Sequence, residues 1–193
     1  MTDVVRVAIN IALVGVFVAL LSFYKRSDNL EINRHRVIGF ILTCSISAFR
    51  LSIIEQVMFV MVMFNAYTDM INMQLYLMVV LIQTLIAIMY TVFNYNNGGT
   101  NIEYIVEAVL IYMILFVIRA YCIGDALMLI DVALVISKRW QNSIVIEIVL
   151  MIAIAVFLIR WVLYMVQNKK EHKRRIDFTL GIAIAYLTVC FIA

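Results

Sequence analysis

Residues 144–166 read IVIEIVLMIAIAVFLIRWVLYMV, and Glu147 and Arg160 are their only charged side chains. A helix needs about 20 mainly apolar residues to cross a bilayer, which this stretch provides. Seven further stretches have the same character, at residues 4–23, 37–49, 51–67, 75–93, 102–121, 126–136 and 178–193. The second and sixth of the eight are short. The pattern predicts an all-α integral membrane protein, a polytopic bundle of about eight transmembrane helices (six to eight).

The composition of the chain supports this fold class. Of the 193 residues, 66% are apolar, 14% are charged and none is proline, which excludes an ordinary soluble globule and a disordered tail. Proline interrupts helix interiors, so its absence fits a chain made almost wholly of long helices. No internal repeat or extramembrane domain is visible, and we expect residues 1–193 to form a single transmembrane domain.

Positive charge gathers in two segments, 25–36 and 168–176. Placing both in the cytosol gives that side nine lysines and arginines against four outside, as the positive-inside rule favours. This orientation puts both chain ends outside and needs a tight turn near Arg50. The net charge of +3 belongs to these loops rather than to a soluble basic surface. We therefore expect the lipid bilayer, and not nucleic acid, as a partner.

Ionisable side chains in or beside the spans are candidate functional groups, because charge is costly inside a membrane. Five of them lie within a turn or two of a predicted interface: Arg6, Arg50, Glu55, Glu103 and Glu147. Such side chains can extend toward water, and we interpret these five as snorkelling residues rather than site residues.

Several kinds of site are eliminated by spacing. No GxSx motif occurs, and His35 and His172 lie in cationic loops without HExxH spacing, so neither a serine nucleophile nor a zinc site is predicted. Cys44, Cys122 and Cys190 show no CxxC spacing, and we interpret them as small buried apolar side chains. We expect no metal and no organic cofactor.

Two carboxylates remain at matching depth. Asp69 ends the third span on the cytosolic side, and Asp125 begins the sixth span on that side. Two neighbouring carboxyls share one proton, so one can act as a base and the other as an acid. Gly124 has no side chain and would let an extended substrate backbone approach. The alternative is that each aspartate marks a helix end, with Asp125 capping the sixth span.

The sequence around these aspartates resembles the prepilin peptidase family, the GxGD-type membrane aspartyl proteases that process the leader peptides of type IV pilin-like precursors. The likeness runs from about residue 54 to 193. Asp69 matches the family's first aspartate, and Cys122-Ile123-Gly124-Asp125 matches its GxGD motif. KRRIDFTLG at 173–181 is similar to the basic entry into its final helix.

This resemblance implies an aspartic-type endopeptidase with Asp69 and Asp125 as its catalytic residues. It implies precursors with short basic leaders as partners, and a prokaryotic plasma membrane as the location, with cleavage near the cytosolic side. The paired CxxC motifs of larger members are missing, so the chain resembles a short form without the methyltransferase domain.

Some positions depart from the family pattern. Cys122 replaces the first glycine of GxGD, the sequence LYL at 75–77 stands in place of IPN, and Asp177 and Leu180 stand where the family has prolines. These losses favour a first alternative, a non-catalytic homologue that acts in pilus or secretion assembly.

Asp131 is an additional acid and suggests a second alternative. A small proton or cation carrier would use Asp69, Asp125 and Asp131 as a relay, although no repeat or Gly/Pro-interrupted helix pair supports it. At 100° per residue Asp131 points about 240° away from Asp125. We therefore predict that Asp131 pairs with Arg119 or Lys138 and does not join the dyad.

Overall fold

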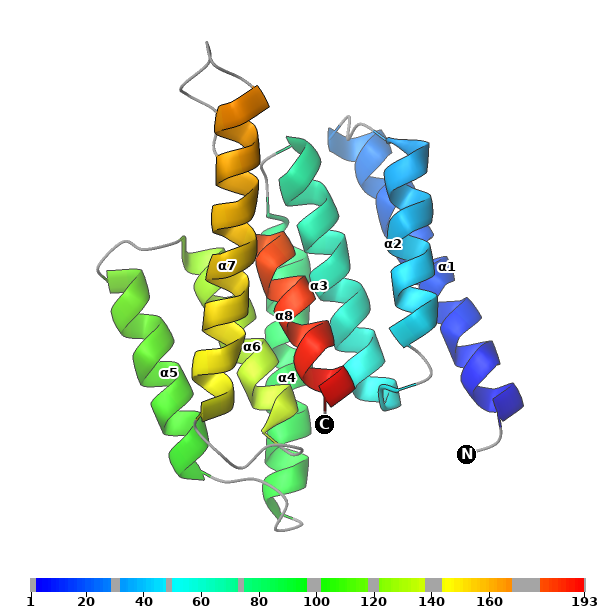
Figure 1. Ribbon diagram of the computed structural model, residues 1–193. Coiled ribbons are helices and arrows are strands. Elements are labelled where there is room, and N and C mark those ends of the chain that lie inside the picture. The colour runs from blue at the N-terminus through cyan, green and yellow to red at the C-terminus, as the bar shows by residue number, and fades with distance from the viewer. Residues whose placement is uncertain are drawn as a thin grey trace.

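The computed structural model describes residues 3–28, 32–47, 50–72, 75–96, 102–117, 122–137, 144–167 and 178–192. Within these ranges the chain forms eight α-helices and no strand (Figure 1). The helices are α1 (Asp3–Asp28), α2 (Arg34–Ser47), α3 (Ile53–Asn72), α4 (Leu77–Asn96), α5 (Ile102–Val117), α6 (Ile123–Ile136), α7 (Ile144–Gln167) and α8 (Thr179–Ile192). The prediction of an all-α chain with eight helices is confirmed, and each helix overlaps one predicted stretch.

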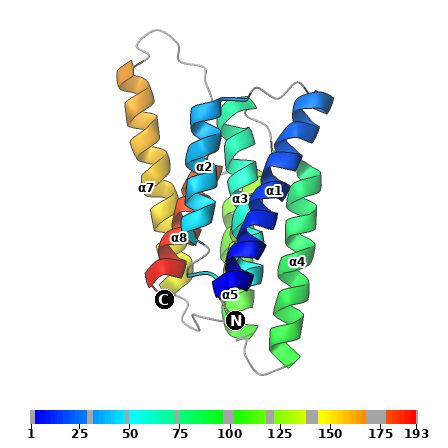
Figure 2. The ribbon, with the colours of Figure 1, turned by 90° about the vertical axis from the view of Figure 1, so that its right-hand side faces the viewer.

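Consecutive helices run in opposite directions, so the bundle has two ends (Figures 1 and 2). The chain termini lie at one of them. The end of α3 and the starts of α2, α6 and α8 lie at the other, which we call the dyad end. This up-and-down order follows from short connections between long helices. It brings residues far apart in sequence to the same level of the bundle.

Helices α3, α6 and α8 contact one another and form the centre of the bundle. Helices α1 and α2 pack on α3, α4 packs on α3 and α6, α5 packs on α6, and α7 packs on α8. In α6 nearly every residue from Gly124 to Ile136 is buried, as expected of a helix that is apolar on all sides.

The outer helices present apolar side chains to their surroundings. Three of them contain stretches long and apolar enough to cross a membrane, by length and composition: Val5–Arg26 in α1, Leu77–Tyr95 in α4 and Ile144–Leu163 in α7. No more than 33% of any of these stretches is buried inside the bundle. Helix α8 is apolar but shorter.

The predicted turn near Arg50 is confirmed, because α2 ends at Ser47 and α3 begins at Ile53. A capping box starts α3: the Ser52 amide donates to Glu55 Oε2 at 2.6 Å, and the Glu55 amide donates to Ser52 Oγ at 3.4 Å. Glu55 is 2% exposed. Its interpretation as a snorkelling residue is therefore wrong, because its carboxylate folds back onto the helix start.

Helix α8 approaches α7 closely at Gly181. A Cβ atom at this position would lie 2.5 Å from the carbonyl oxygen of Ala153 and 3.1 Å from its Cα. Only glycine fits a contact in which two helix backbones meet. The ring of Phe178 packs against Phe157 of α7, with centroids 5.9 Å apart. These two contacts hold the start of α8 against α7.

Candidate active site

The three central helices each contribute one side chain to a polar cluster at the dyad end. Asp69 lies in the last turn of α3, Asp125 in the first turn of α6, and Thr179 at the start of α8. Thr179 Oγ1 lies 2.7 Å from Asp69 Oδ2 and 3.2 Å from Asp125 Oδ1. The structure thus brings the two predicted aspartates together around one hydroxyl, whereas their catalytic role stays a prediction.

The hydrogen bonds of this cluster depend on where its protons lie. A threonine hydroxyl carries one hydrogen and two acceptor lone pairs. It can donate to one carboxylate only. The second contact is a hydrogen bond only if the other carboxyl carries a proton and donates it to Thr179 Oγ1. The arrangement therefore suits a dyad with one proton between its two carboxyls, the state that acid–base hydrolysis requires.

Asp125 has a buried, hydrogen-bonded environment. It is 7% exposed, and the Cys122 thiol donates to its Oδ2 at 2.9 Å. Cys122 holds the N-cap position of α6, so the alternative in which Asp125 caps the sixth span is wrong: the helix begins three residues before 126. A carboxylate in the first turn is favoured by the helix dipole.

The three cysteines differ in their surroundings. Cys44 and Cys190 are buried, as predicted, but Cys122 is exposed. Partial burial and the neighbouring Asp125 carboxylate raise the pKa of the Cys122 thiol, which precedes α6, to about 11. The thiol is therefore protonated at neutral pH and able to donate to Asp125. The interpretation of Cys122 as a buried apolar side chain is wrong.

Gly124 has an intramolecular neighbour. A Cβ atom at this position would lie 2.6 Å from Leu75 Cδ1, so the absence of a side chain lets Leu75 pack against the start of α6. Leu75 belongs to the segment that stands in place of the family's IPN. The contact therefore joins the segment that departs from IPN to the segment that resembles GxGD. Approach of a substrate backbone to Gly124 stays a prediction.

Asp131 lies in a second polar cluster. It is fully buried, and its Oδ2 accepts hydrogen bonds from Gln83 Nε2 at 3.1 Å and Thr84 Oγ1 at 2.9 Å, both from α4. Among the described residues, its hydrogen bonds go to α4 and not to the dyad, in line with the predicted separation on the helix. The predicted partners Arg119 and Lys138 lie outside the described residues. Within the described part, the structure gives Asp131 polar neighbours from α4 instead of a cation.

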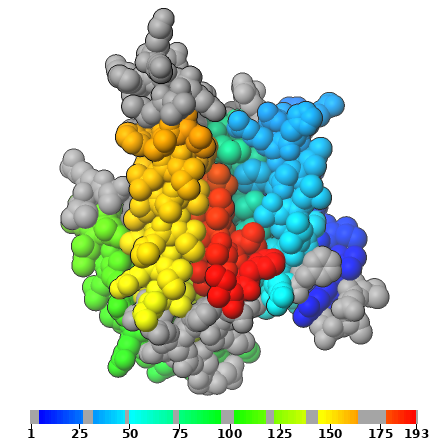
Figure 3. Space-filling view, in the orientation of Figure 1, coloured from blue at the N-terminus to red at the C-terminus, as the bar shows by residue number. Residues whose placement is uncertain are grey.

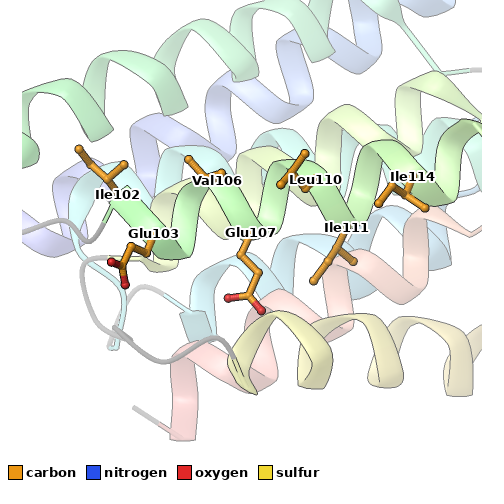
Figure 4. A pocket seen from close by; sticks show the side chains of 7 residues that line it. All are labelled: Ile102, Glu103, Val106, Glu107, Leu110, Ile111 and Ile114. Carbon is orange, nitrogen blue, oxygen red and sulfur yellow. The ribbon is translucent and has the colours of Figure 1, made fainter.

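One hollow on the described surface is lined by none of the dyad residues. A pocket of about 520 Å³ follows α5 and is lined by residues of that helix alone, from Ile102 to Ile114 (Figure 4). Glu103 and Glu107 lie on the same side of the helix there. The walls come from one helix, so this pocket does not resemble an enclosed site.

Among the described residues no group of three or more His, Cys, Asp or Glu side chains is arranged to hold a metal ion. His172 and most of the basic segment 173–181 lie outside the described residues. Sequence reasoning missed Thr179 as a site residue. The available signal was a hydroxyl at the first position of a largely apolar helix, three residues after the cationic segment 168–176.

Comparison with protein-family models, with curated proteins and with solved structures finds no match to this chain. The case for its function therefore depends on the geometry of the cluster and on the order of motifs in its own sequence.

Proposed function

We propose that this protein is an integral membrane aspartic endopeptidase of the prepilin peptidase type, with Asp69 and Asp125 as its catalytic dyad. The observation that carries the proposal is the shared hydroxyl of Thr179, which contacts a carboxylate oxygen of each aspartate. Carboxyls from two helices held this way meet the geometric need of aspartyl chemistry. The substrate is a pilin-like precursor with a short basic leader.

In the proposed reaction one carboxylate accepts a proton from water while the water oxygen bonds to the scissile carbonyl carbon. The other carboxyl donates its proton to the carbonyl oxygen. In the second step the carboxyl that took the proton from water gives it to the leaving nitrogen as the C–N bond breaks. The other carboxylate recovers its proton from a hydroxyl of the gem-diol intermediate, and the new carboxyl group is released. Thr179 keeps the two carboxyls close enough to exchange these roles. No metal or organic cofactor takes part in the scheme.

The proposed location is a prokaryotic plasma membrane crossed by all eight helices. The outward apolar faces of α1, α4 and α7 support this placement. Lys25 and Arg26 end α1, and Arg34 and Arg36 begin α2, at the same end of the bundle as the dyad. The positive-inside rule assigns that end to the cytosol, where the leader of a precursor would lie.

The test is co-expression with a pilin-like precursor, with leader removal followed by the shift of the precursor band on a gel. We expect cleavage by the wild-type chain, and a loss of at least a hundredfold in Asp69→Asn and Asp125→Asn. An amide keeps the shape of each side chain but can be neither the base nor the acid of the dyad.

Three outcomes would contradict the proposal. Equal cleavage by wild type and either variant would remove the dyad assignment. If the wild type cleaves no precursor and liposome ion flux depends on Asp125, the chain is a carrier. If neither activity appears while the chain co-purifies with pilus or secretion components, it is a non-catalytic assembly partner.

A further inference from the structure

A groove runs between α2 and α8 and has α3 as its floor. It has a volume of about 340 Å³. Three helices each present one face to it, at positions 36, 39, 40 and 43 of α2, 59 and 63 of α3, and 180, 183, 184 and 187 of α8. Figure 3 shows this face of the molecule, with α8 lying between α7 and α2. We call this feature the α2/α8 groove.

The floor and walls of the groove are apolar. Phe40, Phe59 and Met63 are buried side chains of the core. Thr43 is the one hydroxyl residue of the lining. Its hydroxyl donates to the carbonyl oxygen of Gly39 at 2.9 Å, so its hydrogen is already used within the helix. Positions 36 to 43 span two helical turns, or about 10 Å. The groove thus offers a narrow apolar channel along the bundle.

One end of this channel is positively charged. Arg36 is the only charged residue of the lining, and it lies in the first turn of α2, which contains no acidic residue. Asn33 directly precedes the helix, and its Oδ1 accepts a hydrogen bond from the Arg36 amide at 3.3 Å. The Asn33 amide donates to Tyr67 Oη of α3 at 3.0 Å. A helix start of this kind, with its dipole, favours an anion beside Arg36.

The charge of the groove bears on the kind of apolar occupant. Arg36 is the only charge in a lining that is otherwise largely apolar. A cation at one end of an apolar channel matches a molecule that has an anionic head and an apolar tail. Basic sites between helices at the cytosolic side of a membrane are known to bind anionic lipid head groups.

We propose that the α2/α8 groove binds one anionic phospholipid, with its phosphate at Arg36 and the start of α2 and an acyl chain along Phe40 and Met63. This inference rests on the membrane location proposed above, but not on the peptidase dyad. The lipid would bridge α2 and α8, and so connect the peripheral pair α1 and α2 to the helix that carries Thr179.

Gly39 allows a sharp test. A Cβ atom at Gly39 would meet nothing within 4 Å, so a side chain can start at this lining position without a clash at Cβ. Gly39→Leu therefore adds bulk to the groove and raises helix propensity. Gly15 of α1 is equally open, and Gly15→Leu is the matched control. Arg36→Gln removes the cation. Arg34→Gln is the charge control. It also removes one arginine charge, but from a position two residues before Arg36 and about 200° away around the helix.

The experiment measures lipid retained by the purified full chain in neutral detergent by native mass spectrometry, together with the thermal midpoint, during titration with phosphatidylglycerol or phosphatidylcholine. We expect one tightly retained phosphatidylglycerol and a rise in midpoint. Arg36→Gln should weaken binding about fivefold, and Gly39→Leu should abolish it. Arg34→Gln and Gly15→Leu should bind as the wild type does.

Several results would overturn the inference. These are equal binding of phosphatidylcholine, a midpoint shift reproduced by inorganic phosphate, and lipid retained by Gly39→Leu. Retained lipid in Gly39→Leu together with lost precursor cleavage would assign the groove to a substrate helix instead. Extraction of the chain from membranes by alkaline carbonate would contradict the membrane location itself. Lost cleavage in Asp125→Asn with lipid retained would leave the groove assignment intact.

Discussion

The hydroxyl of Thr179 connects the two aspartates of the cluster. Thr179→Val keeps the shape of the side chain but removes the hydroxyl that contacts both carboxyls. A hydrogen bond to a charged group contributes about 1.5–3 kcal/mol, so we expect kcat for leader removal to fall about ten- to a hundredfold. Thr179→Ser restores the hydroxyl and should cleave within a few-fold of wild type. Equal rates in the valine and wild-type chains would show that the hydroxyl is not needed.

Cys122 gives a chemical readout of Asp125 that needs no substrate. The thiol is exposed, but its pKa is raised to about 11 by partial burial and by the Asp125 carboxylate. The thiolate is the reactive form, so maleimide should label Cys122 slowly at pH 7.5. Asp125→Asn removes the negative charge, which lowers the thiol pKa, increases the thiolate fraction and should speed labelling several-fold.

The site of labelling is assigned by peptide mass spectrometry, because Cys44 and Cys190 are buried and should stay unmodified in the folded chain. Asp131→Asn is the matched control, since Asp131 accepts its hydrogen bonds from α4. A labelling rate that rises equally in both variants would mean general loosening of the fold. A rate unchanged in Asp125→Asn would contradict the contact between Cys122 and Asp125.

At the scale of elements, the position of α8 decides whether the cluster forms. Gly181→Ala would place a methyl group 2.5 Å from the carbonyl oxygen of Ala153, and a backbone atom cannot rotate away as a side chain can. Helix α8 must shift, and Thr179, two residues earlier, shifts with it. We expect a loss of about 1–3 kcal/mol in stability and a fall in cleavage comparable with Thr179→Val. The thermal midpoint and the cleavage rate measure the two effects.

Gly39→Ala is the control for this substitution, because a Cβ atom at Gly39 meets nothing within 4 Å. Alanine in an open helical position should stabilise the chain by about 0.5–1 kcal/mol. If Gly181→Ala is as stable and as active as Gly39→Ala, then close contact between α7 and α8 does not position Thr179.

The number of helices in the described residues and their places in the chain were predictable, because each helix corresponds to an apolar stretch. Their ends were not, because polar residues such as Asp69 and Asp125 lie within the terminal turns of α3 and α6. The order of Asp69 and Asp125 in an up-and-down bundle also predicted that they share a depth. The third member of the cluster was not predictable in this way. Whether Thr179 reaches both aspartates depends on how α8 crosses α3 and α6, and hydropathy carries no information on that angle. Glu55 was misassigned for a related reason. Its exposure was inferred from how close it lies in sequence to a predicted helix end, whereas the capping box turns its carboxylate back onto the helix start.

At the scale of the whole molecule, the polar cluster and the outward apolar faces belong to different helices. The three mutually contacting helices α3, α6 and α8 carry the polar cluster, whereas α1, α4 and α7 present long apolar faces outward. The cluster lies at the dyad end of these three helices. The orientation of that end relative to the membrane therefore decides which compartment supplies the substrate.

Two exposed positions at opposite ends of the bundle test this orientation. His35 lies at the start of α2, and Ile192 ends α8 and is 69% exposed. In a Cys122→Ser background, which keeps a donor for Asp125, we expect Ile192→Cys to react with a membrane-impermeant maleimide on intact cells. His35→Cys should react only after permeabilisation, because the proposed orientation places the cationic dyad end in the cytosol. The opposite pattern would turn the dyad outward and contradict cleavage of a cytosolic leader. Labelling of neither position before permeabilisation would contradict the membrane-spanning arrangement.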